Sequence, residues 1–231
     1  MTPRPVTAAA GLCIDTSTKL TASECKALKA AGVGTVWRYV FFSMPRPGDI
    51  DEGERDLILG AGLMLCLVQH VRMPGWIASK ATGLNDGLAA ISNAQRAGYQ
   101  GAGLSLALDM EGVGTGDANA HAEAWCEVVS QNDYAPVVYV GFDSQLTGQQ
   151  LDVLTGSPAF WCDYAPFSAR PAPARGYSLH QHAQSVLAGV GVDENTVIHD
   201  GAIVGLSGGP ATYDTDPAPP DPHVDPSGTN V

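Results

Sequence analysis

Short apolar runs alternate with amphipathic stretches along most of this chain. The apolar runs have the length of buried strands, and they predict strands over 11–15, 35–40, 63–68, 104–108, 136–140, 159–162, 177–182, 192–198 and 202–206. Apolar positions at helical spacing predict helices over 21–31, 51–61, 84–97, 118–131 and 147–154. The segment Thr21-Ala22-Ser23-Glu24 has the form of a capping box, which indicates where the first helix begins.

The alternation of strand and helix over about eight units is typical of a parallel α/β fold. The number of units favours a single (β/α)8 TIM-type barrel over an open sheet, and we expect residues 11–206 to form it. The last units are expected to be irregular, because residues 164–176 contain Pro and Gly and show no helical periodicity. No G-x-G-x-x-G segment or P-loop follows a predicted strand, so nucleotide-binding folds are disfavoured and we expect no cofactor.

The two ends of the chain differ from this pattern. Residues 1–10 are interpreted as an N-terminal extension, and they lack the apolar run of a signal peptide. Residues 207–231 contain six prolines and no Lys or Arg, which predicts a Pro/Asp-rich disordered tail. No apolar run approaches the roughly 20 residues of a membrane-spanning helix, so we expect no membrane partner.

Composition narrows the possible partners. The net charge is −12, from 12 basic and 24 acidic residues, which argues against binding to nucleic acid phosphates. The five cysteines are not arranged as a C-x-x-C pair, and several lie in apolar runs. We therefore expect buried, reduced thiols.

Carboxylates stand where several apolar strands end. Asp109 and Glu111 follow the strand predicted over 104–108, and residues two apart on a strand share a face. Similar positions are held by Asp15, Asp163 and Asp193. Because barrel enzymes collect their chemistry at the carboxyl ends of the strands, we expect one acidic cleft. Paired carboxyl groups resist simultaneous ionisation, so one stays protonated beside an anion, as glycoside hydrolysis requires.

Four segments, taken in their order along the chain, resemble the pattern of a known protein family. They are Gly11-Leu12-Cys13-Ile14-Asp15, Leu108-Asp109-Met110-Glu111, Phe160-Trp161-Cys162-Asp163-Tyr164, and Gln181 followed by Val192-Asp193-Glu194-Asn195. This order resembles the family 25 glycoside hydrolases, which are lysozyme-like muramidases on a (β/α)8-type barrel. The strand containing Trp37-Arg38-Tyr39 is more similar to the glycoside-hydrolase-like domains of unknown function found in bacteria and phages.

The resemblance implies a glycosidase that cleaves peptidoglycan or a related N-acetylated glycan. Glu111 would be the general acid, and Asp109 would orient the substrate's N-acetyl group or stabilise an oxocarbenium ion. Asp15 and Asp193 would complete the catalytic cleft. Residues expected to contact substrate are Trp161, Asp163, Tyr164, Gln181, His180, His182, Arg38 and His70. Among these, Trp161 and Tyr164 would stack on sugar faces, and Arg38 would reach the acid cluster.

One difference from the muramidase sequences motivates two alternative functions. His180-Gln181-His182 stands where they usually carry Trp-Gln-Tyr, which removes two rings that would stack on sugars. A catalytically inactive barrel that binds glycan or cell wall is therefore a second hypothesis. A metal-dependent hydrolase, with both histidines facing inward beside Asp163 or Asp193, is a third. We expect no metal, because no third nitrogen or sulfur ligand is evident.

The expected partner is a glycan, and we expect a monomer. Without a recognisable signal peptide, we expect synthesis in the cytoplasm and, for a phage endolysin-like protein, release to the cell wall through a holin or another non-classical route.

Overall fold

A closed barrel organises the molecule. The structure is a computed structural model that describes residues 2–141, 143–156, 159–163 and 171–208. In this part of the chain eight strands form a ring in the order β4-β3-β2-β11-β10-β9-β8-β6, and β6 pairs back with β4. Their bounds are β2 Gly11–Thr16, β3 Thr35–Val40, β4 Met64–Gln69, β6 Leu104–Asp109, β8 Tyr134–Val140, β9 Ala159–Cys162, β10 Leu179–Leu187 and β11 Val190–Val197.

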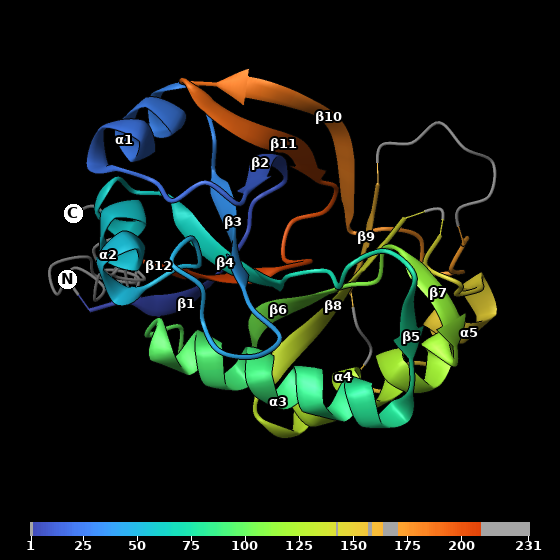
Figure 1. Cartoon of the computed structure of the whole chain (residues 1–231). Coiled ribbons are helices and arrows are strands. Elements are labelled where there is room, and N and C mark those ends of the chain that lie inside the picture. Colours follow the sequence, from blue (N-terminus) through green and yellow to red (C-terminus); the bar gives the residue numbers. More distant parts are fainter. Residues whose placement is uncertain (1, 142, 157–158, 164–170, 209–231) are drawn as a thin grey trace, which may run out of the picture.

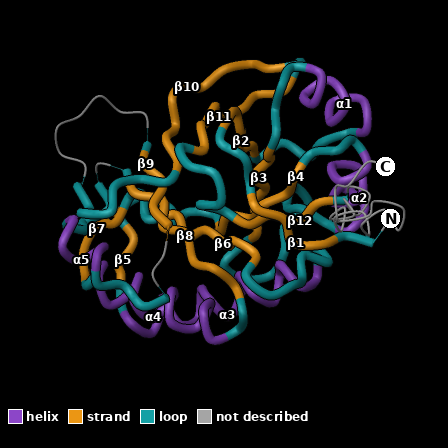
Figure 2. Tube along the Cα trace, turned by 180° about the vertical axis from the view of Figure 1, so that it is seen from behind, coloured by secondary structure: helices purple, strands orange, loops and turns teal. Residues whose placement is uncertain are grey.

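Helices lie outside the ring of strands (Figures 1 and 2). They are α1 Ala22–Ala30, α2 Glu52–Gly60, α3 Lys80–Arg96, α4 Ala118–Gln131 and α5 Gly148–Asp152. The predicted capping box is present at α1, where Thr21 and Glu24 bond to each other's backbone. Strands and helices alternate, so the prediction of a TIM-type barrel is confirmed.

The last barrel unit departs from an all-parallel arrangement. Strand β11 runs antiparallel to both of its neighbours, β10 and β2, whereas the other pairs in the ring are parallel. The two-residue turn Ala188-Gly189 joins β10 to β11 with φ values of 53° and 83°. A tight turn with two positive φ values reverses the chain, whereas a parallel neighbour needs a longer crossover connection. The predicted irregularity of the last units therefore takes the form of a hairpin.

Three strands, β1 (Arg4–Thr7), β5 (Trp76–Ala78) and β7 (Val113–Gly116), were not predicted from the sequence. Within the proposed N-terminal extension, β1 pairs with β12 (Val204–Ser207), which in turn pairs with β4, so this segment adds to the barrel's sheet. Strands β5 and β7 form a separate two-stranded parallel sheet. Residues 209–231, which hold nearly all of the predicted disordered tail, lie outside the described residues.

Apolar side chains fill both faces of the barrel strands. One cluster contains Trp37, Val137 and Trp161 from inward-facing strand positions, and a larger cluster lies between the strands and the helices. Burial on both faces explains why the strands read as nearly continuous apolar runs. All five cysteines are buried free thiols, as predicted. Among the described helices, none is long and apolar enough to cross a membrane.

Candidate active site

The carboxyl ends of the parallel strands surround a small acidic cavity. Its volume is about 40 Å³, and its lining comprises Asp15, Tyr39, Val68, Asp109, Glu111, Tyr139, Trp161, Gln181 and Asp193. Each of the eight barrel strands contributes one residue to this lining, as expected where strand ends converge. The sequence prediction of one acidic cleft therefore agrees with where these side chains lie.

Asp15 is held by two hydrogen bonds at the end of β2. The Asn195 side-chain amide donates to Asp15 Oδ2 at 2.8 Å, and the Tyr39 hydroxyl donates to Asp15 Oδ1 at 2.8 Å. Burial, followed by the charge of Asp193, raises the pKa of Asp15 to about 7, although these two hydrogen bonds oppose the rise. Asp15 therefore changes its charge near neutral pH.

Asp109 and Glu111 form the centre of the cavity. The Glu111 backbone N–H donates to Asp109 Oδ1 at 3.0 Å, which fixes the two residues relative to each other. Burial and then the charge of Glu111 raise the pKa of Asp109 well above its usual range. Burial also raises the pKa of Glu111, and the charges of Asp143, Asp163 and Asp193 add to the rise, whereas a hydrogen bond from Tyr139 to the ionised carboxylate opposes it. The pair therefore resists simultaneous ionisation, so one carboxyl group keeps the proton that an acid catalyst needs.

The loop that carries Glu111 is braced by the small β5–β7 sheet. The Trp76 indole N–H donates to the Glu111 carbonyl oxygen at 2.9 Å, and Gly75 N–H donates to the Gly112 carbonyl at 2.8 Å. Gly112 N–H donates to Asp143 Oδ2 at 2.9 Å. Gly112 has a φ of 66°, a conformation that glycine adopts without strain. These contacts define the direction in which the chain leaves β6.

A wider cleft adjoins the acidic cavity. It has a volume of about 370 Å³ and shares Asp15, Tyr39 and Asp193 with the cavity. Its other walls come from the loop after β2 and from the β10–β11 hairpin, namely Thr16, Ser17, Thr18, Gln184, Ser185, Gly191 and Val192. The Thr16 hydroxyl donates to the Gly191 carbonyl at 2.7 Å and joins the two walls. Hydroxyl and amide groups of this kind match the hydrogen-bonding groups of a sugar.

Several predicted substrate contacts lie at the cavity but are buried within it. Trp161 is 2% exposed, packs against Trp37 at 5.2 Å between ring centroids, and donates its indole N–H to Asn195 Oδ1 at 2.8 Å. Its faces are covered, so the expectation that it stacks on a sugar is wrong for this conformation. Gln181, near the start of β10, and Asp163, directly after β9, are buried. Tyr164 lies outside the described residues.

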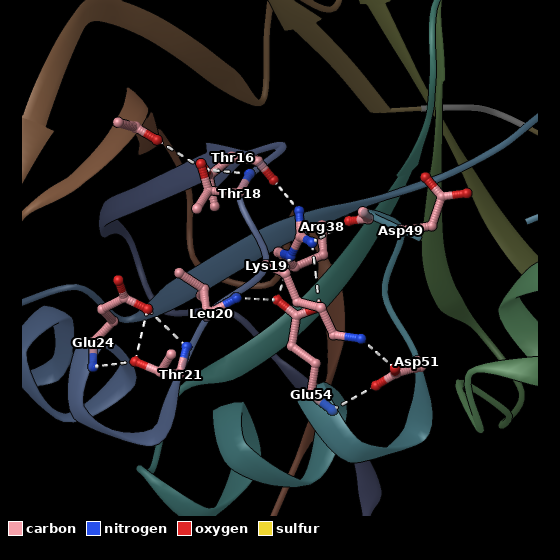
Figure 3. Close-up of polar contacts among 12 residues, drawn as sticks. Thr16, Thr18, Lys19, Leu20, Thr21, Glu24, Arg38, Asp49, Asp51 and Glu54 are labelled. Atoms are coloured by element: carbon pink, nitrogen blue, oxygen red, sulfur yellow. Dashed lines mark hydrogen bonds and ion pairs between the residues drawn. The ribbon is translucent and has the colours of Figure 1, made fainter. Parts of the chain in front are cut away.

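Arg38 does not reach the acid cluster, which corrects the sequence prediction. It alternates along β3 with the inward-facing Trp37, so its side chain points away from the barrel interior toward α2. There its Nε donates to Glu54 Oε1 at 2.7 Å (Figure 3). Arg38 also donates to the carbonyl oxygens of Thr16 and Gly48. The guanidinium group is fully buried and anchors loops rather than substrate.

The three predicted histidine contacts lie away from the centre of the cavity. His180 and His182 alternate with the inward-facing Gln181, so the idea that both face inward is wrong. His182 Nε2 lies 2.7 Å from Thr196 Oγ1, and His180 packs edge-on against Tyr177. His70 stacks on Tyr39 and lies 3.1 Å from Asp49 Oδ1. Within the described residues, no group of three or more His, Cys, Asp or Glu is arranged to hold a metal.

Sequence reasoning missed Tyr139, whose hydroxyl lies 3.2 Å from Glu111 Oε1. It also assigned no role in the site to Tyr39. Two signals were present for Tyr139: it falls near the end of a predicted strand, and it lies two residues after the inward-facing Val137. For Trp76, which follows Pro74-Gly75, the sequence left two roles open, lining the cleft or covering the end of the barrel, because the short strand that holds it has no periodicity to detect.

Comparisons with known proteins agree with this geometry. A family model described as "Rv2525c-like, glycoside hydrolase-like domain" matches residues 26–197. The Tat-secreted protein Rv2525c of Mycobacterium tuberculosis, in complex with HEPES, superimposes with a TM-score of 0.60 at 20% identity, covering 82% of this chain and 96% of that one. A bacterial lysozyme from Streptomyces coelicolor gives a TM-score of 0.54 at 16% identity, with coverages of 84% and 94%.

A third similar structure is the modular Cpl-1 endolysin complexed with a peptidoglycan analogue. Its TM-score is 0.55 at 15% identity, covering 83% of this chain and 55% of that one. At these identities the structural matches establish a shared fold alone. No curated protein matches the chain in sequence.

Proposed function

Because the chain belongs to the Rv2525c-like family of glycoside hydrolase-like domains, we propose that it hydrolyses glycosidic bonds in peptidoglycan or a related N-acetylated glycan. The observation that carries this proposal is the pair Asp109 and Glu111, fixed by a 3.0 Å hydrogen bond in a cavity of further carboxyl groups. A raised pKa on Glu111 keeps its proton available for transfer.

In the proposed reaction Glu111 gives its proton to the glycosidic oxygen as the bond from that oxygen to the anomeric carbon breaks. Asp109 assists either by orienting the substrate's N-acetyl group, whose oxygen attacks the anomeric carbon, or by stabilising the oxocarbenium ion. Asp15 and Asp193 border both the cavity and the wider cleft, so they are suited to position the sugar or the incoming water.

The similar structures support the choice of substrate class. They include a lysozyme and an endolysin that was complexed with a peptidoglycan analogue. The polar cleft of about 370 Å³ beside the acidic cavity is large enough to admit sugar units.

The decisive experiment measures the release of new reducing ends from purified peptidoglycan at pH 5 to 7. We expect wild-type protein to release them and Glu111→Gln to be slower by about 10²–10⁴-fold, the usual contribution of a general acid. Glu127→Gln is the matched control, because it makes the same change on α4, outside the cavity. Equal rates for Glu111→Gln and wild type would refute the proposed mechanism.

One observation favours a second function, glycan binding without turnover. The cavity at Glu111 holds only about 40 Å³, which is less than a sugar ring occupies, whereas the neighbouring cleft is wider. A barrel of this shape would bind a glycan in the cleft without bringing its glycosidic bond to Glu111. Saturable binding of soluble glycan fragments by calorimetry, with no reducing ends released by folded wild-type protein, would establish this alternative.

A further inference from the structure

The hydroxyl group of Tyr139 lies between two acceptors. It donates to Gln181 Oε1 at 2.6 Å and, when Glu111 is ionised, to Glu111 Oε1 at 3.2 Å. A tyrosine hydroxyl has one proton, so it donates to one of these oxygens at a time, while its oxygen still accepts from another group. Which oxygen receives that proton determines whether Tyr139 stabilises the ionised or the protonated form of Glu111.

The neighbours of Gln181 determine which oxygen receives the proton of Tyr139. Burial raises the pKa of Asp193, but its carboxylate accepts hydrogen bonds from the side chains of Gln184 and Gln181, and these bonds favour its ionised form. An ionised carboxylate only accepts, so the amide nitrogen of Gln181 must face Asp193. The amide oxygen is then left for Tyr139, in agreement with the shorter of the two distances. When Glu111 is protonated, the proton of Tyr139 is therefore directed to Gln181, and the tyrosine oxygen is free to accept from Glu111.

The surroundings of Glu111 contain several acids. The groups that face it are Asp109 from the end of β6, Tyr139 on β8, Asp143 beyond β8, Asp163 beyond β9, Asp193 on β11 and Asp15 on β2. Within the described residues, the hydrogen bonds and charge interactions of Glu111 involve no Lys, Arg or His. A neutral Glu111 avoids repulsion from these carboxylates, but its acidic proton still needs an acceptor.

We propose that Tyr139 is the acceptor for the proton of Glu111, and that Gln181 and Asp193 hold Tyr139 in that orientation. The hydrogen bonds run in one direction, from Glu111 to Tyr139, from Tyr139 to Gln181, and from Gln181 to Asp193. Each donor is polarised by the acceptor that follows it, so the anionic Asp193 on one side of the cavity stabilises the protonated acid on the other. The catalytic meaning of this chain rests on the proposed function, in which Glu111 must begin the reaction protonated.

The chain makes Tyr139 and Gln181 positioning residues for the acid. This differs from the substrate contact that the sequence predicted for Gln181, and it assigns Tyr139 a role that the sequence did not. No proton leaves Tyr139 or Gln181 in this arrangement; only the proton of Glu111 passes to the glycosidic oxygen as that bond breaks.

The test measures the pKa of Glu111 directly, by following its side-chain carboxyl ¹³C shift with pH and assigning the signal through Glu111→Gln. Because Tyr139→Phe removes the acceptor of the acidic proton, we expect the pKa of Glu111 to fall by about one unit. Tyr134→Phe is the matched control, because its hydroxyl lies on the same strand and donates to the Tyr99 carbonyl, away from the cavity. A rise in the pKa of Glu111 in Tyr139→Phe would overturn the proposal, since it would mean that Tyr139 donates to the carboxylate.

A second variant tests the orientation of Tyr139. In Gln181→Leu the tyrosine proton is released to turn toward Glu111, so the pKa of Glu111 should fall there also. In a Tyr139→Phe background the same Gln181→Leu change should have no further effect. An equal effect of Gln181→Leu in both backgrounds would overturn the proposal, because the influence of Gln181 would then bypass Tyr139.

These pKa measurements need no turnover, so they separate the two proposals. The expected pKa changes without glycan cleavage by wild type would retain the hydrogen-bond chain and remove the proposed function. Cleavage that depends on Glu111, together with a raised pKa in Tyr139→Phe, would retain the function and remove the chain. If wild type is active, the alkaline limb of its pH–rate profile should move to lower pH in Tyr139→Phe, while Tyr134→Phe keeps the wild-type limb.

Discussion

Two regions that bury charged side chains, one outside the barrel strands and one inside them, do so in opposite ways. Outside the strands, the fully buried Glu54 accepts from Arg38 Nε at 2.7 Å and from the Leu20 backbone N–H at 2.8 Å (Figure 3). Inside the carboxyl end of the barrel, Asp15, Asp109, Glu111 and Asp193 face one another. Among the described residues, none of these four carboxylates forms an ion pair with a base.

The difference separates a structural use of charge from a chemical one. Arg38 and Glu54 satisfy each other and tie together the loop after β2, the loop after β3 and the start of α2. Carboxylates that repel one another in a buried cavity oppose folding, and such clusters are concentrated where proteins perform chemistry. The first region should therefore lose stability when a partner is removed, and the second should gain it.

The largest expected effect on stability comes from breaking the buried ion pair between Arg38 and Glu54. Arg38→Met leaves the Glu54 carboxylate buried without its partner, and we expect a loss of about 3–5 kcal/mol in the free energy of unfolding. Urea denaturation followed by circular dichroism measures this change. The double variant Arg38→Met with Glu54→Leu should recover much of the loss, because no unpaired charge then remains. A loss below about 1 kcal/mol in the single variant would show that the pair does not hold these loops.

The second prediction is a pH-dependent gain at the acid cluster. The pKa of Asp15 is about 7 in the folded protein against an ordinary value of 3.8 for aspartate, so ionising Asp15 costs the folded state more than the unfolded chain. The contribution of Asp15 to stability is therefore fully present below about pH 4 and is lost as the pH rises to about 7. Asp15→Asn cannot ionise, so its stability relative to wild type should rise over this interval by at most about 4 kcal/mol.

Urea denaturation of wild type and Asp15→Asn at pH 4, 5.5, 7 and 8 tests this sign. The difference between the two proteins at each pH isolates Asp15 from the other titrating groups. A stability difference that stays constant from pH 4 to 8 would contradict the view that Asp15 is a destabilising buried carboxyl. A rise confined to that interval would support it.

The same two regions show what the sequence could predict. The rule that strand ends converge placed Asp15, Asp109, Glu111 and Asp193 together, because these residues end or flank strongly apolar runs. Arg38 was misplaced although the necessary information was present. Residues alternate along a strand, so an inward-facing Trp37 already directs Arg38 outward. The error for His180 and His182 has the same origin, because residues on either side of Gln181 cannot share its face of the strand.

Other features depended on contacts that local patterns do not contain. Strand β1 has four residues, and its partner β12 lies about 200 positions away, so no local periodicity identified it. The hydrogen bonds of Tyr139 likewise join β8 to β10 and to the loop after β6, and these segments are distant in sequence.

A smaller effect is expected when the hydrogen bond between Trp76 and the loop that carries Glu111 is removed. Trp76→Phe keeps an aromatic ring but removes the indole N–H that donates to the Glu111 carbonyl at 2.9 Å. We expect a loss of about 1 kcal/mol in stability, the usual net value of one hydrogen bond. If the protein is a glycosidase, kcat should fall with little change in KM, because Glu111 is displaced while the cleft is intact. Trp125→Phe, which removes an indole bond to Gln69 away from Glu111, is the control for general destabilisation. Equal kcat in Trp76→Phe and wild type would exclude a positioning role.

The smallest effect should come from an ion pair that lies close to Arg38 but at the surface. Lys19 pairs with Asp51, which caps α2, and the two side chains are 44% and 55% exposed (Figure 3). Water and salt screen an exposed pair, so Lys19→Ala should cost about 0.5 kcal/mol in urea denaturation at low salt and less in 0.5 M NaCl. Asp51→Ala should cost more than Lys19→Ala, because it also removes the acceptor of the Glu54 backbone N–H at 2.9 Å. A loss at Lys19→Ala as large as that at Arg38→Met would mean that burial does not set the strength of these pairs, and the contrast between the two regions would then lack its physical basis.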